Sequence, residues 1–198
     1  MKRMQGNYTR AIVIVHGKCE FIMSQYIKNN LRLKMEILAD KKGKKSIQIT
    51  SLKQYLKKQG FESLDEFIQK FDDIEYNYEI NSFINFKIFI IMDTDDCTDH
   101  QAKEFKNKNI FKKAWYYQYV VPIYDSPNLD TILKKCEVLP NRKIKDDEKV
   151  RIYTKAFPID KNYQTSDLSQ LKELSQKLSK DKNTNLEIFI DYCLRCKV

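Results

Sequence analysis

Two strongly apolar runs, at 11–15 and 86–92, stand out in the pattern of hydrophobic and polar positions along the chain, and only Lys87 interrupts the second. Apolar runs without alternation are typical of strands that are buried on both faces, as in a parallel sheet covered by helices. Shorter apolar stretches at 35–38 and 119–124 predict two further strands. We therefore expect an α/β fold with a central, mostly parallel sheet of about four strands.

Helices are predicted between and after these strands, because apolar residues recur there at helical spacing. The predicted helices span 20–33, 46–58, 63–71, 99–108, 129–136, 166–178 and 186–194. Residues 72–85 are predicted to form a loop, and 150–157 either a helix or a strand. Asn183 or Thr184 is expected to cap the last helix.

The chain is predicted to form a single domain. It has 198 residues, which is the size of one domain. It contains no internal repeat and no linker that is long enough, or rich enough in Gly and Ser, to separate two domains. We expect this domain to span residues 1–198, with a helical C-terminal part at about 128–198 packed on the sheet.

The chain carries an excess of positive charge. Its 36 Lys and Arg residues against 27 Asp and Glu residues give a formal net charge of +9. A basic protein attracts polyanions, so nucleic acid or a nucleotide is the expected partner. The abundance of Lys, Asn, Ile and Tyr is also typical of proteins encoded by AT-rich genomes, and the charge would then be an ordinary solvated surface. With 42% apolar residues, the chain is too hydrophobic for wholesale disorder.

Neither a membrane span nor an export signal is predicted. No apolar run approaches the ~18–20 residues of a membrane span, and the stretch at 11–15 is too short for the core of a signal peptide. We therefore expect a cytoplasmic protein without a membrane partner. Among the five cysteines only Cys193 and Cys196 have C-x-x-C spacing. That spacing is compatible with free reduced thiols and with a redox or metal-binding pair.

Polar, reactive side chains directly follow the two strongest predicted strands. His16 comes after the first strand, and Asp93 and Asp95 come after the strand at 86–92. Open α/β sheets bind ligands outside the carboxyl ends of their strands, and Mg²⁺ is typically held by one or two carboxylates together with phosphate oxygens. Asp93 and Asp95 are therefore candidate ligands of a divalent cation. Alternatively, the aspartates of this segment only cap the helix that follows Cys97.

The stretches "IVIVHGKCE" and "IFIIMDTDD" resemble the motifs of the Toprim domain, which topoisomerases, bacterial primases and OLD-type nucleases share. The family pattern is a glutamate in a strand-ending turn, an acidic residue a few positions further on, and a strand-ending D-x-D. The resemblance covers about residues 10–130. The small size and the Lys-Gly-Lys-Lys turn are most similar to RloB-like and related phage-defence Toprim proteins. In one departure, His16 stands where the family carries its catalytic glutamate.

The resemblance implies a Toprim-like fold and a metal-dependent nuclease that acts on RNA or DNA phosphodiesters, in bacterial defence against phage. The catalytic residues that it implies are His16, Glu20, Asp93 and Asp95. Of these, Glu20, Asp93 and Asp95 would hold Mg²⁺ or Mn²⁺. The residues expected to bind substrate phosphates are Lys18, Lys42, Lys44 and Lys45. A protein partner in a defence complex and a homodimer are both compatible with the resemblance.

His16 leaves three interpretations open, because a neutral imidazole brings no negative charge and binds Mg²⁺ poorly. In the first, carboxylates alone hold Mg²⁺ and His16 is a general acid or base. In the second, His16 is itself a ligand and favours Mn²⁺ or another softer cation. In the third, the domain has lost catalysis and His16 is a turn residue. The protein would then bind nucleic acid, or serve as a regulatory or sensor subunit of a defence complex.

Two further groups of residues have both a functional and an ordinary interpretation. His100, seven residues after Asp93, is either an additional ligand or acid/base group or an exposed surface histidine. The aromatic cluster at 115–119 either stacks on bases or packs in the core ahead of the last predicted strand.

Overall fold

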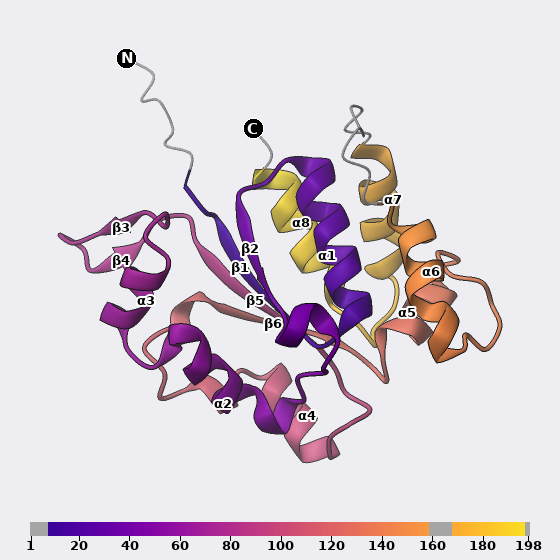
Figure 1. Cartoon of the computed structure of the whole chain (residues 1–198), viewed down its shortest axis with the longest axis horizontal. Coiled ribbons are helices and arrows are strands. Elements are labelled where there is room, and N and C mark those ends of the chain that lie inside the picture. Colours follow the sequence, from indigo (N-terminus) through magenta and orange to yellow (C-terminus); the bar gives the residue numbers. More distant parts are fainter. Residues whose placement is uncertain (1–7, 159–167, 197–198) are drawn as a thin grey trace.

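The computed structural model describes residues 8–158 and 168–196. The first two thirds of the chain contain both strands and helices, and the last third contains helices (Figure 1). The strands are β1 (Ala11–Val15), β2 (Met35–Leu38), β3 (Tyr76–Asn77), β4 (Ser82–Phe83), β5 (Lys87–Asp93) and β6 (Val120–Asp125). The helices are α1 (Lys18–Leu31), α2 (Leu52–Leu56), α3 (Leu64–Lys70), α4 (Asp99–Lys106), α5 (Leu129–Lys135), α6 (Asp146–Ala156), α7 (Leu168–Leu178) and α8 (Leu186–Cys196). Among these helices, none is both long and apolar enough to cross a membrane.

A four-stranded sheet in the order β2-β1-β5-β6 forms the centre of the molecule, and all its neighbouring strands are parallel. In the register of β1 and β5, Ile14 pairs with Ile90. Every residue of β1 is buried, as are residues 88–92 of β5. Helices cover both faces of these strands, which explains why their sequences are apolar without alternation. The predicted α/β class and the parallel sheet of four strands are confirmed.

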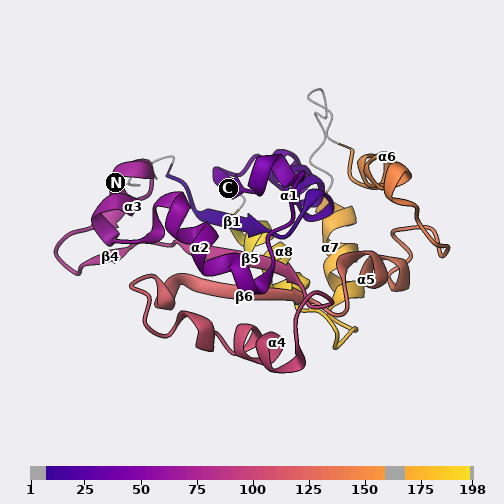
Figure 2. The ribbon, with the colours of Figure 1, turned by 60° about the horizontal axis from the view of Figure 1, so that its bottom comes forward.

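Alternate residues of each central strand enter two separate cores, so the molecule has three layers. Val13 and Val15 of β1 belong to a core with α1, α5, α6, α7 and α8. Ile12 and Ile14 belong to the core on the opposite face, which α2, α3 and α4 cover. Figure 2 shows α1 and α4 on opposite sides of the sheet. The C-terminal helices pack on the sheet, as expected from the sequence.

Most predicted helices form within two residues of their expected ends. The helix predicted at 166–178 is present as α7, although its first two predicted residues lie outside the described part of the chain. The ambiguous segment at 150–157 belongs to α6. Thr184, one of the two expected caps, accepts a hydrogen bond through its hydroxyl oxygen from the backbone N–H of Leu186 at the start of α8 (3.0 Å).

The predicted helix at 46–58 begins later than expected. The backbone N–H of Ile47 donates to the carbonyl oxygen of His16 (2.8 Å), which holds Ile47 in an extended link to the end of β1. A 3-10 turn at Ile49–Ser51 then leads into α2. The helical segment continues in a π-type turn in which Gly60 adopts a φ of 82°. A tertiary contact therefore displaces the start of this helix.

The segment predicted to be a loop at 72–85 contains a short antiparallel pair, β3 and β4. Tyr76 of β3 lies opposite Phe83 of β4, with ring centroids 4.8 Å apart. Two-residue strands in a mainly polar sequence leave little periodicity for a sequence pattern to reveal. The pair extends the core beneath the sheet at the end opposite α5 and α6 (Figure 1).

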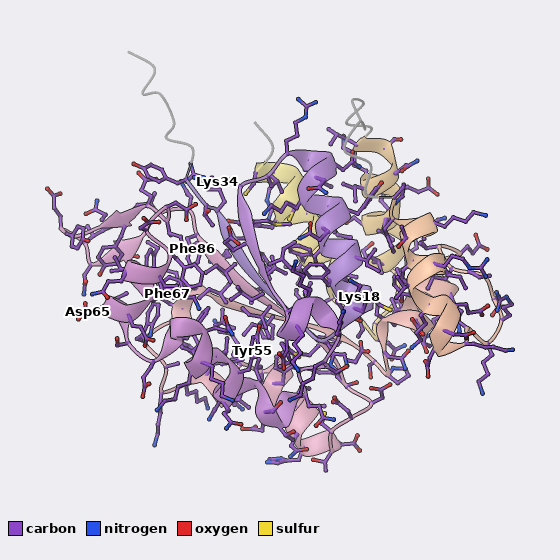
Figure 3. All side chains as sticks on the ribbon, in the orientation of Figure 1. Lys18, Lys34, Tyr55, Asp65, Phe67 and Phe86 are labelled. Carbon is purple, nitrogen blue, oxygen red and sulfur yellow. The ribbon has the colours of Figure 1, made fainter. Side chains whose placement is uncertain are left out.

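The aromatic cluster at 115–119 mainly packs in the core. Figure 3 shows Phe67 and Phe86 close together on one side of the sheet, with ring centroids 6.1 Å apart. The ring of Trp115 lies 4.9 Å from that of Phe67, and Tyr119 is buried. Packing therefore accounts for Trp115, Tyr116 and Tyr119, whereas Tyr117 is exposed.

Candidate carboxylate site

The candidate site lies at the edge of the sheet where β1, β5 and β6 end. His16 follows β1, Asp93 is the last residue of β5, and Asp125 is the last residue of β6. Because parallel strands share one carboxyl edge, these residues meet although they are far apart in the sequence. Lys18 in the first turn of α1 marks the same edge (Figure 3).

Glu20 is held in the first turn of α1 and is only 3% exposed. Its Oε2 accepts a hydrogen bond from the backbone N–H of Gly17 (2.9 Å), so the side chain folds back over the turn after β1. Burial raises the pKa of Glu20, and the neighbouring His16 partly offsets this rise. A buried carboxylate with a raised pKa is one that a nearby cation would stabilise.

Asp93 points from the end of β5 toward the start of α5. Its Oδ1 accepts a hydrogen bond from the backbone N–H of Leu129 (3.0 Å). Burial raises the pKa of Asp93 to about 10, and the negative charges of Glu20 and Asp125 contribute to the rise. Asp93 and Glu20 are therefore close enough for repulsion between their charged forms to matter.

The other two aspartates of the segment lie further out. Asp95 is exposed, and its Oδ2 accepts a hydrogen bond from the side-chain amide of Asn128 (2.7 Å). The carboxylate of Asp96 lies 3.9 Å from Nδ1 of His16, and burial raises the pKa of Asp96. The D-x-D motif is thus divided, since Asp93 faces the buried side of the edge and Asp95 faces the surface.

The helix that follows Cys97 is capped by Thr98. The hydroxyl oxygen of Thr98 accepts a hydrogen bond from the backbone N–H of Gln101 (3.3 Å). The alternative in which the aspartates of this segment only cap that helix is therefore wrong. His100 lies exposed in the first turn of α4, as its ordinary interpretation expects.

Asp125 is a member of the site that sequence analysis missed. It is fully buried (0% exposed), and its Oδ1 accepts a hydrogen bond from the hydroxyl of Thr184 (2.6 Å). Its Oδ2 has no hydrogen-bond partner among the described residues. Burial raises the pKa of Asp125 to about 7. In the sequence this residue looks like the start of a turn, and only the pairing of β5 with β6 places it beside Asp93.

Asp130, in the first turn of α5, is a second carboxylate that the sequence did not single out. It accepts a hydrogen bond from the hydroxyl of Tyr153 (2.6 Å), and its Oδ2 lies 3.1 Å from Nζ of Lys149. Its negative charge contributes to the raised pKa of Glu20. Asp130 is thus already paired with the ammonium group of Lys149. None of the ion pairs among the described residues involves Glu20.

The imidazole of His16 is held in a defined orientation. Its Nδ1 lies 3.0 Å from the carbonyl oxygen of Ile47. Because a carbonyl oxygen only accepts, Nδ1 carries the proton of this hydrogen bond. Nε2 is then the acceptor atom of the neutral ring, available to take up a proton or to bind a metal ion.

The Lys-Gly-Lys-Lys turn at residues 42–45, called the basic turn below, packs directly against the start of α1. Lys42 and Gly43 both have positive φ, 57° and 81°, and a Cβ added to Gly43 would lie 2.8 Å from Cα of Lys18. Nζ of Lys18 donates to the carbonyl oxygen of Lys42 (3.5 Å). The left-handed turn therefore places the exposed side chains of Lys42, Lys44 and Lys45 beside the carboxylate edge. These are the lysines that the sequence suggested for phosphate binding.

Within residues 8–158 and 168–196, no group of three or more His, Cys, Asp and Glu side chains is arranged to hold a metal ion by itself. The five cysteines, which all lie in these ranges, are free thiols. Cys193 is buried in α8, and burial raises the pKa of its thiol. A protonated thiol binds metal ions weakly, so the raised pKa makes Cys193 a poor metal ligand.

Comparisons of the chain with protein-family models, with curated proteins and with solved structures give no match. The resemblance to the Toprim domain therefore stays a prediction from the two motifs. The function is inferred below from the geometry and the charges of the carboxylate edge.

Proposed function

We propose that the protein is a divalent-metal-dependent nuclease with a Toprim-like site that hydrolyses phosphodiester bonds in RNA or DNA. The main support is the proximity of two carboxylates, Glu20 and Asp93, at the carboxyl edge of a parallel sheet. Burial raises the pKa of both groups, so their charged forms are unfavourable in the metal-free protein. Such a pair is costly unless a cation neutralises it.

The available donor atoms fit Mg²⁺ or Mn²⁺. Both cations accept carboxylate oxygens, and Mg²⁺ commonly takes only one or two protein carboxylates and completes its shell with waters and substrate phosphates. We propose Glu20 and Asp93 as the ligands, whereas Asp95, the third ligand that the resemblance implies, faces the surface and bonds to Asn128. The unpartnered Oδ2 of Asp125 is a further oxygen buried at the same edge. When bound, the cation would orient the phosphodiester and stabilise charge on its oxygens.

His16 is the proposed general acid or base. The hydrogen bond from Nδ1 to the carbonyl oxygen of Ile47 fixes the tautomer and leaves Nε2 as the acceptor atom of the neutral ring. Nε2 would accept a proton from the attacking water, or a protonated ring would return one to the leaving oxygen. The Mn²⁺-ligand interpretation uses the same atom, so the two roles exclude each other.

The lysines beside the site would offset the repulsion between the carboxylates and a polyanionic substrate. Lys18, Lys42, Lys44 and Lys45 lie next to the turn that carries His16. Positively charged side chains in such a position contact phosphates without reading sequence. We therefore propose that the basic turn binds the sugar–phosphate backbone near the scissile bond.

A nucleic-acid-binding domain without catalysis is the second candidate function. It is favoured by His16 at the position of the family's glutamate, and by the lack of a preformed three-residue metal cluster in the described part of the chain. The same basic turn would then serve binding alone. The protein would act as a nucleic-acid-binding module, or as a regulatory or sensor subunit with a protein partner.

We place either activity in the cytoplasm, where the nucleic acids are and where free cysteines stay reduced. A role in phage defence, as a homodimer or within a complex, is the part of the proposal that rests only on the resemblance to RloB-like proteins.

The proposal is tested with labelled tRNA, single-stranded RNA and plasmid DNA, each incubated with the full chain in Mn²⁺, Mg²⁺ or EDTA. We expect cleavage of at least one substrate with metal, none in EDTA, and a loss of at least about 100-fold in Asp93→Asn. Asp65→Asn makes the same charge change on the far side of the molecule from Lys18 (Figure 3) and should cleave like the wild type. A salt-dependent gel shift without cleavage of any substrate would instead support the binding domain.

A further inference from the structure

A cavity of about 600 Å³ lies between α6 and the segment that connects it to α5. It shares no residue with the carboxylate site. Its apolar surface includes Leu139, Pro140 and Ile152, and three cationic side chains, those of Arg142, Arg151 and Lys155, also line it. This size is within the range of small-molecule sites, which combine apolar surface with a few placed polar groups.

The three cations differ in how they are held. Arg151 and Lys155 are exposed and four residues apart on α6, so they lie on the same face of the helix. Neither has an ion-pair partner among the described residues, whereas the guanidinium of Arg142 donates to the carboxylate of Glu148. The pKa of Glu148 is lowered to about 2, chiefly by Arg142, so this carboxylate is charged at neutral pH. Three positive charges against one negative charge leave a net positive cavity.

The apolar surface narrows the ligand class. Leu139 is 4% exposed and belongs to the core, so it forms a fixed wall rather than a mobile side chain. Ile152 is partly buried against the same core. A small inorganic anion would use the cations and leave this surface unused. A phosphate joined to a flat, weakly polar ring would use both.

We propose that this cavity binds a nucleotide, with its phosphate between Arg151 and Lys155 and its base on the apolar surface of Leu139, Pro140 and Ile152. The nucleotide has two possible sources, a free nucleotide or one unit of an RNA or DNA strand. In the second case the inference rests on the proposed nucleic-acid function, and the cavity binds the strand away from the carboxylates.

The test is calorimetry in EDTA with AMP, ribose 5-phosphate and inorganic phosphate. AMP is expected to bind at least about tenfold more tightly than inorganic phosphate, with ribose 5-phosphate between them. The double variant Arg151→Gln/Lys155→Gln should bind AMP at least about tenfold more weakly, because the loss of even one charge-assisted hydrogen bond to phosphate costs about that factor. The control Lys53→Gln/Lys58→Gln removes the same charge from two exposed lysines in and after α2, on the other face of the sheet, and should bind AMP like the wild type. Equal AMP affinity in the two double variants, or AMP binding no tighter than phosphate, would overturn the proposal.

A single-stranded hexamer of adenosine nucleotides separates the two sources. If the cavity takes part of a strand, the hexamer binds at least about tenfold more tightly than AMP, and AMP competes with it. If it takes a free nucleotide, AMP binds as tightly as the hexamer. Asp93→Asn should keep the wild-type affinity for AMP, so a failure of cleavage and a failure of nucleotide binding are distinguishable.

Discussion

Asp93 and Asp125 are register partners at the ends of neighbouring parallel strands, which sets two carboxyl groups side by side at one edge of the sheet. Burial is the largest cause of the raised pKa of each group, about 10 for Asp93 and about 7 for Asp125. Above neutral pH the metal-free protein therefore either keeps a proton on these groups or carries poorly solvated charge. A bound cation would remove this cost.

Asp93→Asn is expected to stabilise the metal-free protein at pH 8 by roughly 2 kcal/mol, because a carboxyl with a raised pKa must take up a proton when the protein folds at this pH and the neutral amide does not. The amide oxygen still accepts the hydrogen bond from Leu129. A carboxyl with a raised folded-state pKa contributes its full stability below its unfolded pKa of about 3.9, and loses it as the pH rises toward the folded value. Urea unfolding in EDTA should therefore show a larger gain at pH 8 than at pH 5. A variant that is less stable than the wild type at pH 8 would contradict this.

Thr184→Val is expected to lower the free energy of unfolding by about 1–3 kcal/mol, because both oxygens of Asp125 would then be buried without a hydrogen bond. The Thr184 hydroxyl lowers the pKa of Asp125 and so favours its charged form. The loss should therefore be greater at pH 8 than at pH 5. Thr50→Val, at an exposed position, is the control. A loss that is larger at pH 5 would show that the hydroxyl does not support the charged carboxylate.

The sequence predicted the central strands closely because each is a continuous apolar run whose burial on both faces needs no alternation. It also placed Glu20 and Asp93 at one edge, since residues that follow parallel strands converge. It could not place Asp125 or Asp130, because their proximity depends on which strand lies beside β5 and on how α5 enters from it. Strand order is a tertiary property that local pattern does not contain.

The predictions for the segments at 46–58 and 72–85 differ from the structure for the same physical reason. The predicted helix at 46–58 loses its first residues to the hydrogen bonds between Ile47 and His16, which lie 31 residues apart. In the β3–β4 pair, Tyr76 and Phe83 pack with the aromatic core, and that contact, rather than strand propensity, fixes the pair. In both cases long-range contacts override the local preference.

Gly43→Ala is expected to destabilise the protein by roughly 1–3 kcal/mol and to weaken nucleic-acid binding. The position has a φ of 81°, and the added Cβ would meet backbone atoms of Lys18 at 2.8 Å, so the basic turn must move. Gly60→Ala is the matched control. Its φ is 82°, but the added Cβ would meet the flexible side chain of Lys70. Gel-shift titrations should show weaker nucleic-acid binding only for Gly43→Ala. Equal binding by both variants would show that the basic turn does not contact the nucleic acid.

His16→Asn tests the role of the imidazole while keeping its structural contact. The asparagine amide can replace Nδ1 as the donor to the carbonyl oxygen of Ile47, but it offers no equivalent of Nε2. If His16 is the acid or base, cleavage should fall at least about 100-fold while nucleic-acid affinity stays within about twofold. If it binds Mn²⁺, activity should partly return at high Mn²⁺ concentration. Unchanged cleavage would leave His16 as a turn residue.

The proposed metal site is tested most directly by calorimetric titration of Mn²⁺ into the wild type, Glu20→Gln, Asp93→Asn and Asp65→Asn at pH 8. The two site variants keep the shape of their carboxyl groups and lose the charge, and Asp65 lies on α3 on the far side of the molecule (Figure 3). We expect the wild type and Asp65→Asn to bind Mn²⁺ with equal affinity, and Glu20→Gln and Asp93→Asn to bind it at least about tenfold more weakly. Equal heats in all four proteins would show that the buried carboxylates of Glu20 and Asp93 hold no divalent cation.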